Sequence, residues 1–387
     1  MKIRKRLLAL PLSLALAVSL CACGVTADPT GGTDNPSPDV SPDPGAVPSI
    51  EADLTRNAVD FAAGLSPDDV LLTVNGGDGP ADIFLYWLFM DCYYFEYSYY
   101  FYGLTVDGYA DMLLEDTVNT AKYYTVLRQK AAELGCLPTD AQVQEAMDEL
   151  LAQGQGYYDS LRTAYGLSDG SFDYLTTLPC YYDNLLDAMV PSVTDEALNG
   201  YVYRVKHILL KTKDDQNQPL SDDEIAAQKA QAENILARLQ AVEGEEQQSL
   251  FDELMNQYSQ DGRDENGGLY APDGYTAVPG DMVTEFEEAS LALPIGGLSG
   301  IVESSYGYHI ILRGEVDNPE DYADDCRAYQ MDNELEALAE QAQVTRADAL
   351  GALDVAAFYA RYTAYQNAVM EQYESTGGET PTYGDAS

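Results

Sequence analysis

The chain has 387 residues and carries 65 acidic against 20 basic side chains, a formal net charge of −45 at neutral pH. Such a surface repels polyanions, which argues against nucleic acid and against anionic lipid headgroups as partners. Basic unfolded polypeptides, metal ions and a cationic cell wall suit this charge better, although strong charge also promotes solubility by itself.

The N-terminal residues have the pattern of an export signal. A basic start, MKIRKR, is followed by an apolar segment from Leu7 to Leu20. At about 14 residues this segment is too short to span a bilayer as a helix. The residues Leu20-Cys21-Ala22-Cys23 are similar to the bacterial lipobox, so we expect removal of residues 1–22 and lipidation of Cys23. Cleavage of an ordinary secretory signal at a nearby bond is the alternative.

The expected anchor and the segment after it indicate a location outside the cell membrane. Two or three acyl chains on Cys23 would hold the chain on the outer face of that membrane. Residues 27–49 contain six prolines and three glycines with almost no apolar side chains, so residues 23–52 are predicted to be a flexible tether. The long tether, and the absence of Asp after Cys23, favour a cell with a single membrane.

Four further cysteines lie in the remaining chain, at Cys92, Cys136, Cys180 and Cys326. The nearest neighbours are 44 residues apart, which is not a metal-ligand spacing. Export permits disulfides without requiring them. We expect buried free thiols rather than bridges.

Residues 53–200 are predicted to form a helical domain. A short strand at Val70–Val74 is followed by an Asn75-Gly76 turn and then by a helix. Further helices are expected at 109–134, 139–153 and 171–189. The stretch DCYYFEYSYYFYG, residues 91–103, places aromatic rings around much of one helix. These rings either pack against other helices or form an adhesive surface for unfolded chains.

Residues 201–316 have a different pattern, which predicts an α+β domain with an antiparallel sheet. A strand at 201–210 precedes helices near 222–240 and 249–258, a Gly- and Asp-rich loop, the short helix TEFEEASLAL, and the strands SGIVES and YGYHIILRG. Residues 317–374 are again helical and are expected to pack back onto the first helical domain, which would make that domain discontinuous. The last residues, 375–387, are expected to be a loose tail.

The two histidines of the chain both lie in predicted strands of the α+β domain. Alternation along YVYRVKHILLK places His207 on one strand face with Tyr203, Val205 and Leu209. His309 occupies the final strand. A buried core histidine is the ordinary explanation for one such residue. Two in one small sheet make a shared site the better hypothesis.

Five blocks around these histidines resemble parvulin-type (PpiC-type) peptidyl-prolyl isomerases. They are VKHILLK, FDELMNQYSQD, GG, MVTEFEEASLAL and GGLSGIVESSYGYHIILR, and together they cover residues 202–314. The resemblance implies a four-stranded antiparallel sheet with helices, inserted in a mostly α-helical chaperone domain. The flanking helices, the VNG opening and the lipobox are similar in layout to extracytoplasmic foldases of the PrsA and SurA group.

The resemblance also implies site residues. It places His207 and His309 at the centre of the active site with their rings hydrogen-bonded, and adds Asp261 and Ser304 as polar site groups. Substrate-binding positions carried over from the family are Leu269, Met282 and Phe286. The chain departs from the family at GGLYAP, residues 267–272, where the family has GGDLG and an aromatic residue. The shape of that loop, and with it rate and substrate preference, is therefore left open.

The activity implied by the resemblance is cis/trans isomerisation of X-Pro bonds in unfolded exported polypeptides, without cofactor, metal or nucleophile. Lys211 and Lys213 are followed by Asp214-Asp215, which argues against phosphoserine recognition. The main alternative is a tethered holdase with little or no isomerase activity. A homodimer is left open, and a purely structural lipoprotein would leave the five blocks unexplained.

Two metal sites are alternatives to this interpretation. His207, His309 and Asp261 are suitable ligand types, but a separation of 102 residues between the histidines has no metal signature. The loop DGRDENGGLYAPD partly matches a calcium loop, yet Gly262 stands where the first acidic ligand belongs and Asp273 where Glu is usual. A solvated acidic loop accounts for it better.

Overall fold

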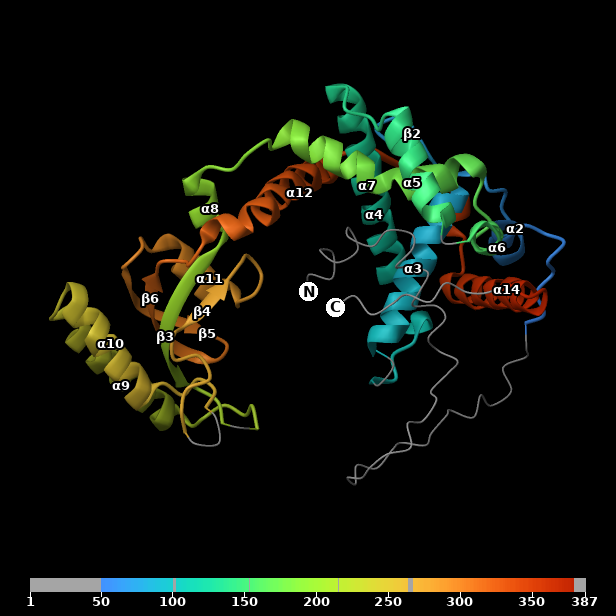
Figure 1. Ribbon diagram of the computed structural model, residues 1–387. Helices are drawn as coiled ribbons and strands as arrows, with labels where there is room; N and C mark the ends of the chain where they lie inside the picture. Colours follow the sequence, from blue (N-terminus) through green and yellow to red (C-terminus); the bar gives the residue numbers. More distant parts are fainter. Residues whose placement is uncertain (1–49, 100–101, 153, 215, 264–266, 379–387) are drawn as a thin grey trace. The chain divides into compact units, whose positions relative to one another are not determined.

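The computed structural model of the chain describes residues 50–99, 102–152, 154–214, 216–263 and 267–378 (Figure 1). These residues divide into two units, one formed by the chain up to Met189 and from Met331 onward, the other by Val190–Gln330. The predicted signal peptide, Cys23 and nearly all of the predicted tether lie outside the described residues, as does the end of the predicted tail. In the described ranges, no helix is both long and apolar enough to cross a membrane.

The first unit is built mainly of helices. Its helices are α2 (Ala58–Ala63), α3 (Ala81–Tyr99), α4 (Val106–Leu134), α5 (Asp140–Ala152), α6 (Gln155–Ala164), α7 (Asp169–Met189), α13 (Asp348–Gly351) and α14 (Val355–Ser375). Helix α12 (Ala323–Gln341) contains the boundary between the units. Helix α4 ends at Gly135, whose φ of 68° gives the left-handed C-cap that glycine adopts without strain.

The C-terminal helix α14 packs among the N-terminal helices of this unit, against α2, α4 and α6. Two of its tyrosines, Tyr362 and Tyr365, are buried and donate hydrogen bonds to backbone carbonyls far away in sequence. Tyr362 Oη donates to Tyr165 O at 2.6 Å and Tyr365 Oη to Arg56 O at 2.7 Å. A buried hydroxyl needs such a partner, so these two bonds fix where α14 lies against the N-terminal part of the unit.

A small sheet, in the order β2-β1-β7, lies beside these helices. It consists of β1 (Val70–Val74), β2 (Gly77–Pro80) and β7 (Val344–Arg346), all antiparallel. Asn75 and Gly76 have φ values of 51° and 79°, as the hairpin turn between β1 and β2 requires. The predicted strand and turn are present, but a second strand separates the turn from α3, so the expectation of an immediate helix was wrong.

Most rings of the aromatic helix α3 pack against other helices. Phe89 lies 5.2 Å from Tyr362 and 5.9 Å from Tyr165 between ring centroids, and Tyr86 lies 5.2 Å from Tyr165. Tyr97 is an exception, with 69% of its surface exposed. Packing therefore accounts for most of this composition, because each ring buries a large area and prefers tilted or edge contacts.

The second unit contains a four-stranded antiparallel sheet in the order β4-β3-β6-β5, which confirms the predicted α+β class. Its strands are β3 (Tyr203–Lys211), β4 (Tyr275–Ala277), β5 (Leu298–Ser304) and β6 (Gly307–Gly314). Its helices are α8 (Asp195–Tyr201), α9 (Asp222–Gln240), α10 (Gly244–Tyr258), α11 (Thr284–Ala292) and the 3-10 helix η4 (Pro319–Tyr322). Ser221 begins α9 with a complete capping box to Glu224.

Helices cover both faces of this sheet. On one face, Ile208 and Ile310 pack with residues of α9 and α10 such as Ile235 and Phe251. On the other face, Val205 and Ile311 pack with Phe286 of α11. Alternation along β3 and β6 puts both histidines on the face that α11 covers.

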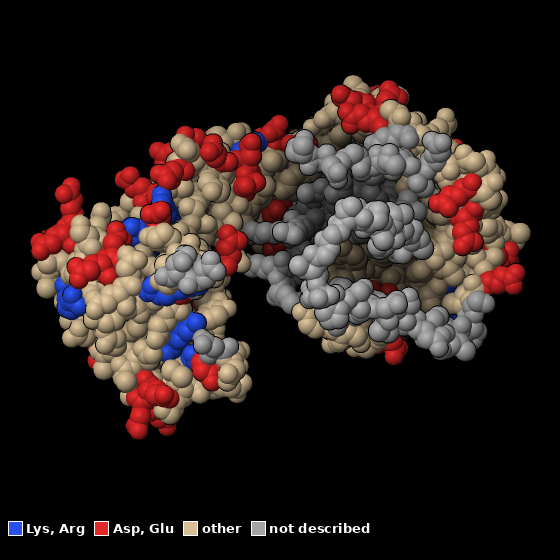
Figure 2. All heavy atoms as spheres, turned by 60° about the horizontal axis from the view of Figure 1, so that its bottom comes forward, with Lys and Arg blue, Asp and Glu red and all other residues tan. Residues whose placement is uncertain are grey.

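Acidic side chains are distributed widely over the molecular surface. On the face drawn in Figure 2 they form separate groups on both units, with basic side chains between them mainly on the second unit. Cys92, Cys136, Cys180 and Cys326 are unpaired, and Cys92 and Cys326 are buried.

Candidate active site

The two histidines meet on neighbouring strands because of the register between β3 and β6. Leu209 lies opposite His309, and His207 lies opposite Ile311, so the histidines are diagonal neighbours on one face. Their rings are nearly parallel, with an interplanar angle of 13°, and the two Nδ1 atoms are 3.1 Å apart. His207 is 8% exposed and His309 3%. The ring pair is therefore buried and held by the sheet itself.

The ring pair continues at both ends into a chain of side-chain hydrogen bonds. His207 Nε2 is 3.1 Å from Asp261 Oδ2, which also accepts a bond of 2.6 Å from Tyr275 Oη. At the other end, Ser304 Oγ is 2.7 Å from His309 Nε2 and accepts from Tyr306 N–H at 3.1 Å. The five side chains from Tyr275 to Ser304 thus form one continuous network.

When both rings are neutral, a single arrangement of protons satisfies this network. A carboxylate only accepts, so His207 Nε2–H donates to Asp261 and His207 Nδ1 accepts. His309 Nδ1–H must then donate to His207, and His309 Nε2 accepts from the Ser304 hydroxyl. Both rings cannot be charged together, because two N–H groups would face each other across 3.1 Å. Asp261 therefore sets the tautomers of both histidines.

The pKa values of the network follow from burial and from these bonds. Burial works to raise the pKa of Asp261, but hydrogen bonds from His207 and Tyr275 outweigh it, and the pKa lies well below its ordinary value. Burial, reinforced by the His207 ring, lowers the pKa of His309 to about 4. Burial and the Asp261 carboxylate raise the pKa of Tyr275 to about 12. At neutral pH, His309 is neutral, Asp261 is a carboxylate and Tyr275 is a phenol.

An apolar wall closes over the ring pair from α11. The Phe286 ring meets both histidines edge-on, with centroid distances of 5.1 Å to His207 and 5.2 Å to His309. Met282, just before α11, packs partly buried against the same cluster of side chains. Arg313 of β6 fixes the end of α11, because its guanidinium donates to Leu291 O at 2.9 Å and Leu293 O at 2.7 Å. The site thus combines a network of hydrogen-bonded polar side chains with an aromatic ring packed against it.

The structure brings most of the predicted site residues together and places one elsewhere. His207, His309, Asp261 and Ser304 form the network, and Phe286 and Met282 form the wall. The expectation for Leu269 was wrong. This side chain, 9% exposed, packs with the core cluster on the opposite face of the sheet, which α9 and α10 cover. Leu269 lies in the GGLYAP segment, where the sequence departs from the pattern of the family that it resembles.

Sequence reasoning missed three contributors to the site. Tyr275 binds Asp261, and its ring lies 5.8 Å from the His207 ring. Ser259 Oγ accepts from Leu209 N–H at 3.1 Å and so ties the end of α10 to β3. From the sequence, Arg313 is only one residue of a predicted strand. Tyr275 lies in a three-residue strand, too short to show alternation, and neither of the other two carried a local signal.

Metal binding gains no support from the described part of the chain. Among those residues, no group of three or more His, Cys, Asp or Glu side chains is arranged to hold a metal ion. Asp264 and Asn266 of the calcium-like loop lie outside the described residues.

Residues 207–315 match the model of the Rotamase family, described as the PPIC-type PPIASE domain. Together with the sheet, this match confirms that the second unit contains a parvulin-type peptidyl-prolyl isomerase domain. The Foldase protein PrsA of Halalkalibacterium halodurans is 38% identical over 122 residues, which is 31% of this chain and 31% of that protein. Chaperone SurA of Chromobacterium violaceum is 33% identical over 110 residues, 28% of this chain and 22% of that protein.

These two matches span less than a third of the length of each relative. Among solved structures, a peptidylprolyl isomerase (PrsA) from Bacillus cereus aligns over 79% of this chain and 93% of that chain, with 22% identity and a TM-score of 0.32.

Proposed function

We propose that the protein is a parvulin-type peptidyl-prolyl cis-trans isomerase and a foldase of unfolded exported polypeptides. The observation that carries this proposal is the buried hydrogen-bonded chain from Tyr275 to Ser304, covered by Phe286, within the segment that matches the PPIC-type domain.

The reaction requires rotation about a bond with partial double-bond character. Its barrier is about 18–20 kcal/mol, because rotation breaks amide resonance. In the twisted amide, charge separation between nitrogen and carbonyl oxygen is reduced, so a site poor in water favours the twisted state over the planar one. Phe286 and Met282 would hold the proline ring while the preceding residue turns. Stronger binding of the twisted state than of either planar state is sufficient for catalysis.

The site does not suit covalent chemistry, although Ser304 and His309 resemble a nucleophile and its base. An effective general base has a pKa near the working pH. Burial lowers the pKa of His309 to about 4, which makes it a weak base at neutral pH. Its Nδ1 faces another imidazole rather than a carboxylate. The network therefore serves to hold the rings in one tautomer and to shape the pocket.

The remaining proposals concern the whole chain and rest on its sequence. Lipidation of Cys23 would anchor the protein on the outer face of the membrane, with residues 23–52 as tether. Residues 53–200 and 317–374 would form a chaperone domain that holds unfolded clients near the isomerase domain at 201–316. The relatives named foldase and chaperone support this division of work.

Exchange spectroscopy on a short X-Pro peptide tests the isomerase directly. The protein from residue 24 onward should raise the cis/trans exchange rate at substoichiometric concentration. Met282→Ala should reduce that catalysis about tenfold, because it removes a side chain proposed to hold the proline ring and a loss of about 1.4 kcal/mol in transition-state binding is a tenfold loss in rate. Ile295→Ala is the matched control, because Ile295 follows α11 but is 49% exposed. Exchange that the parent protein does not accelerate, or that Met282→Ala leaves unchanged, would contradict the proposed site.

A further inference from the structure

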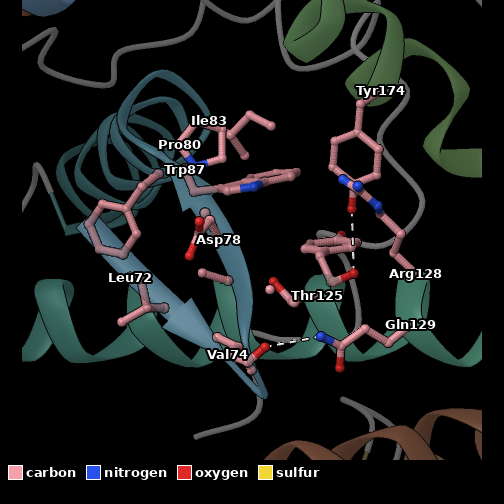
Figure 3. A pocket seen from close by; sticks show the side chains of 15 residues that line it. Leu72, Val74, Asp78, Pro80, Ile83, Trp87, Thr125, Arg128, Gln129 and Tyr174 are labelled. Carbon is pink, nitrogen blue, oxygen red and sulfur yellow. Dashed lines mark hydrogen bonds between the residues drawn. The ribbon is translucent and has the colours of Figure 1, made fainter. Parts of the chain in front are cut away.

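The first unit contains a cavity of about 150 Å³, and none of its lining residues belongs to the site described above. Its walls come from the β1-β2 hairpin and from α3, α4 and α7 (Figure 3). Apolar side chains make up one part of the lining, including Leu72, Ile83 and Trp87. An apolar cavity of about this volume accommodates one benzene ring.

The aromatic side of the cavity is held in place by the packing of its own rings. Trp87 stacks on Tyr124 with ring centroids 4.9 Å apart and an interplanar angle of 6°. Tyr174 Oη donates to Tyr124 O at 3.4 Å. Figure 3 shows the Trp87 and Tyr174 rings on either side of the open space. A planar ring that enters this space would meet aromatic side chains that are already ordered, which lowers the entropy cost of binding.

Charge is distributed unevenly around this cavity. Arg128 lies on the Tyr174 side, its guanidinium carbon 5.6 Å from the centroid of that ring. Among the ion pairs within the described residues, none involves Arg128, although the chain holds 65 acidic side chains. Asp78 lies on the opposite side and accepts from the Thr73 hydroxyl at 3.0 Å. A bound carboxylate would therefore be drawn towards Arg128 and repelled from Asp78.

We propose that this cavity binds a phenylalanine or tyrosine ring of a polypeptide, with a carboxylate next to the ring paired to Arg128. The ring fills the space beside Trp87, and the charge pattern sets its direction. That the ring belongs to a polypeptide rests on the proposed function, whereas the preference for a ring beside a carboxylate rests on the cavity alone.

Trp87 provides the readout, because it is the single tryptophan of the chain. Titration of the protein from residue 24 onward with the peptide acetyl-Ala-Phe-Asp-Ala-amide should shift or quench its fluorescence in a saturable way. The peptide with Asn in place of Asp should bind about fivefold more weakly, as a partly exposed ion pair is worth up to about 1 kcal/mol. N-acetyl-phenylalanine should also bind in preference to its amide.

Three variants locate the binding. Thr125→Phe and Ala121→Leu both place bulk in the cavity from α4, so each should abolish the fluorescence response, and the second serves if the first does not fold. Arg128→Gln should remove the preference for Asp over Asn. Lys130→Gln is the matched control, since it removes a charge from the same helix at a residue that pairs with Glu133 instead.

The outcomes separate this proposal from the proposed function. An absent fluorescence response, a response that survives both filling variants, or equal binding of the Asp and Asn peptides would overturn the proposal. Binding of N-acetyl-phenylalanine without any binding of the peptide would overturn the assignment to a polypeptide. Isomerase activity on an X-Pro peptide should be unchanged in Thr125→Phe, so a failure of the catalytic site would be seen separately.

Discussion

At the residue scale, the two histidines differ from isolated core histidines because all four ring nitrogens have side-chain partners. The two histidines at the centre of the network are buried, whereas Asp261 next to them is less buried, with 28% of its side chain exposed. A buried polar chain in which every member is satisfied fixes one geometry, whereas a single missing partner leaves an expensive unpaired group. A change at Asp261 should therefore alter the geometry of the two histidines.

Asp261→Asn should impair catalysis while the fold is retained. Hydrogen bonds to a charged acceptor are worth about 1 kcal/mol more than bonds to a neutral one, and this carboxylate accepts two of them. We expect kcat/KM for an X-Pro peptide to fall about tenfold. Asp252→Asn is the matched control, because Asp252 pairs with Lys206 at the surface. Equal activity of both variants would show that the carboxylate does not organise the site.

His309 should titrate far below the ordinary range for histidine. Its pKa of about 4 in the folded protein lies below the ordinary value of 6.5. Between these values the unfolded chain binds more protons than the folded one, so stability falls as pH is lowered from about 6.5 to 4, by roughly 2 kcal/mol at pH 5. The depressed pKa of Asp261 acts in the same direction at lower pH.

Proton NMR of the imidazole rings measures this pKa directly, since the chain has two histidines and His309→Gln assigns the signals. A His309 ring that titrates near pH 6.5 would mean that it is not buried in this network.

Sequence and structure agree on the residues whose chemistry is uncommon in the chain. The two histidines could be predicted because alternation placed both on strands, and the family blocks supplied Asp261, Ser304, Met282 and Phe286. Tyr275 could not be separated from the other tyrosines of a chain that has 30 of them. The position of Leu269 depends on the path of a loop, which no periodicity determines.

At the element scale, the site depends on how closely β3 and β6 approach each other. Gly307 begins β6 opposite Lys211, with a φ of 145°. A Cβ at this position would lie 2.2 Å from Leu210 O, a backbone atom that cannot move away alone. Gly307→Ala should therefore destabilise the unit by about 2 kcal/mol or more, from strain at a glycine-specific conformation and a cross-strand clash.

Urea unfolding monitored by circular dichroism checks this prediction. The matched control is Gly300→Ala in β5, where an added Cβ meets no atom within 4 Å. Similar stability of the two variants would mean that β6 tolerates a wider separation from β3 than the structure shows.

Long elements were predictable, and the shortest strands were not. The helices α9, α12 and α14 extend over many turns, so their apolar periodicity was visible in the sequence. The strands β4 and β7 have three residues each, which is too few for any alternation to appear. Helix α6 was also missed, and it begins after Gly154, within a glycine-rich stretch that reads as a loop.

At the scale of the whole molecule, the second unit has hydrophobic clusters of its own. The clusters around Ile235, Phe286 and Val202 all consist of residues between Val190 and Gln330. A unit with its own core folds independently in most cases. The fragment 190–330 should therefore show a cooperative urea transition. It should also retain isomerase activity on short X-Pro peptides within about threefold of the longer protein, because all the residues assigned to the site lie within it.

Activity that disappears in a folded fragment would show that the isomerase site needs residues of the first unit.

The sequence showed where the helical patterns of the chain give way to an α+β pattern and where they resume. How the helices of the first unit pack around α14 was not readable, because contacts between distant segments leave no local pattern.

The proposed function requires the second unit to accelerate proline isomerisation in polypeptide clients through Phe286 and the histidine network that it covers. The most direct measurement follows the refolding of a reference protein whose slow phase is limited by proline isomerisation, with catalytic amounts of the protein from residue 24 onward. We expect the parent protein to accelerate the slow phase and Phe286→Ala to lose this effect, while both proteins still suppress aggregation of the client. An unchanged slow phase with aggregation suppressed by the parent protein would contradict the claim, and the parvulin fold would then serve as a holding module.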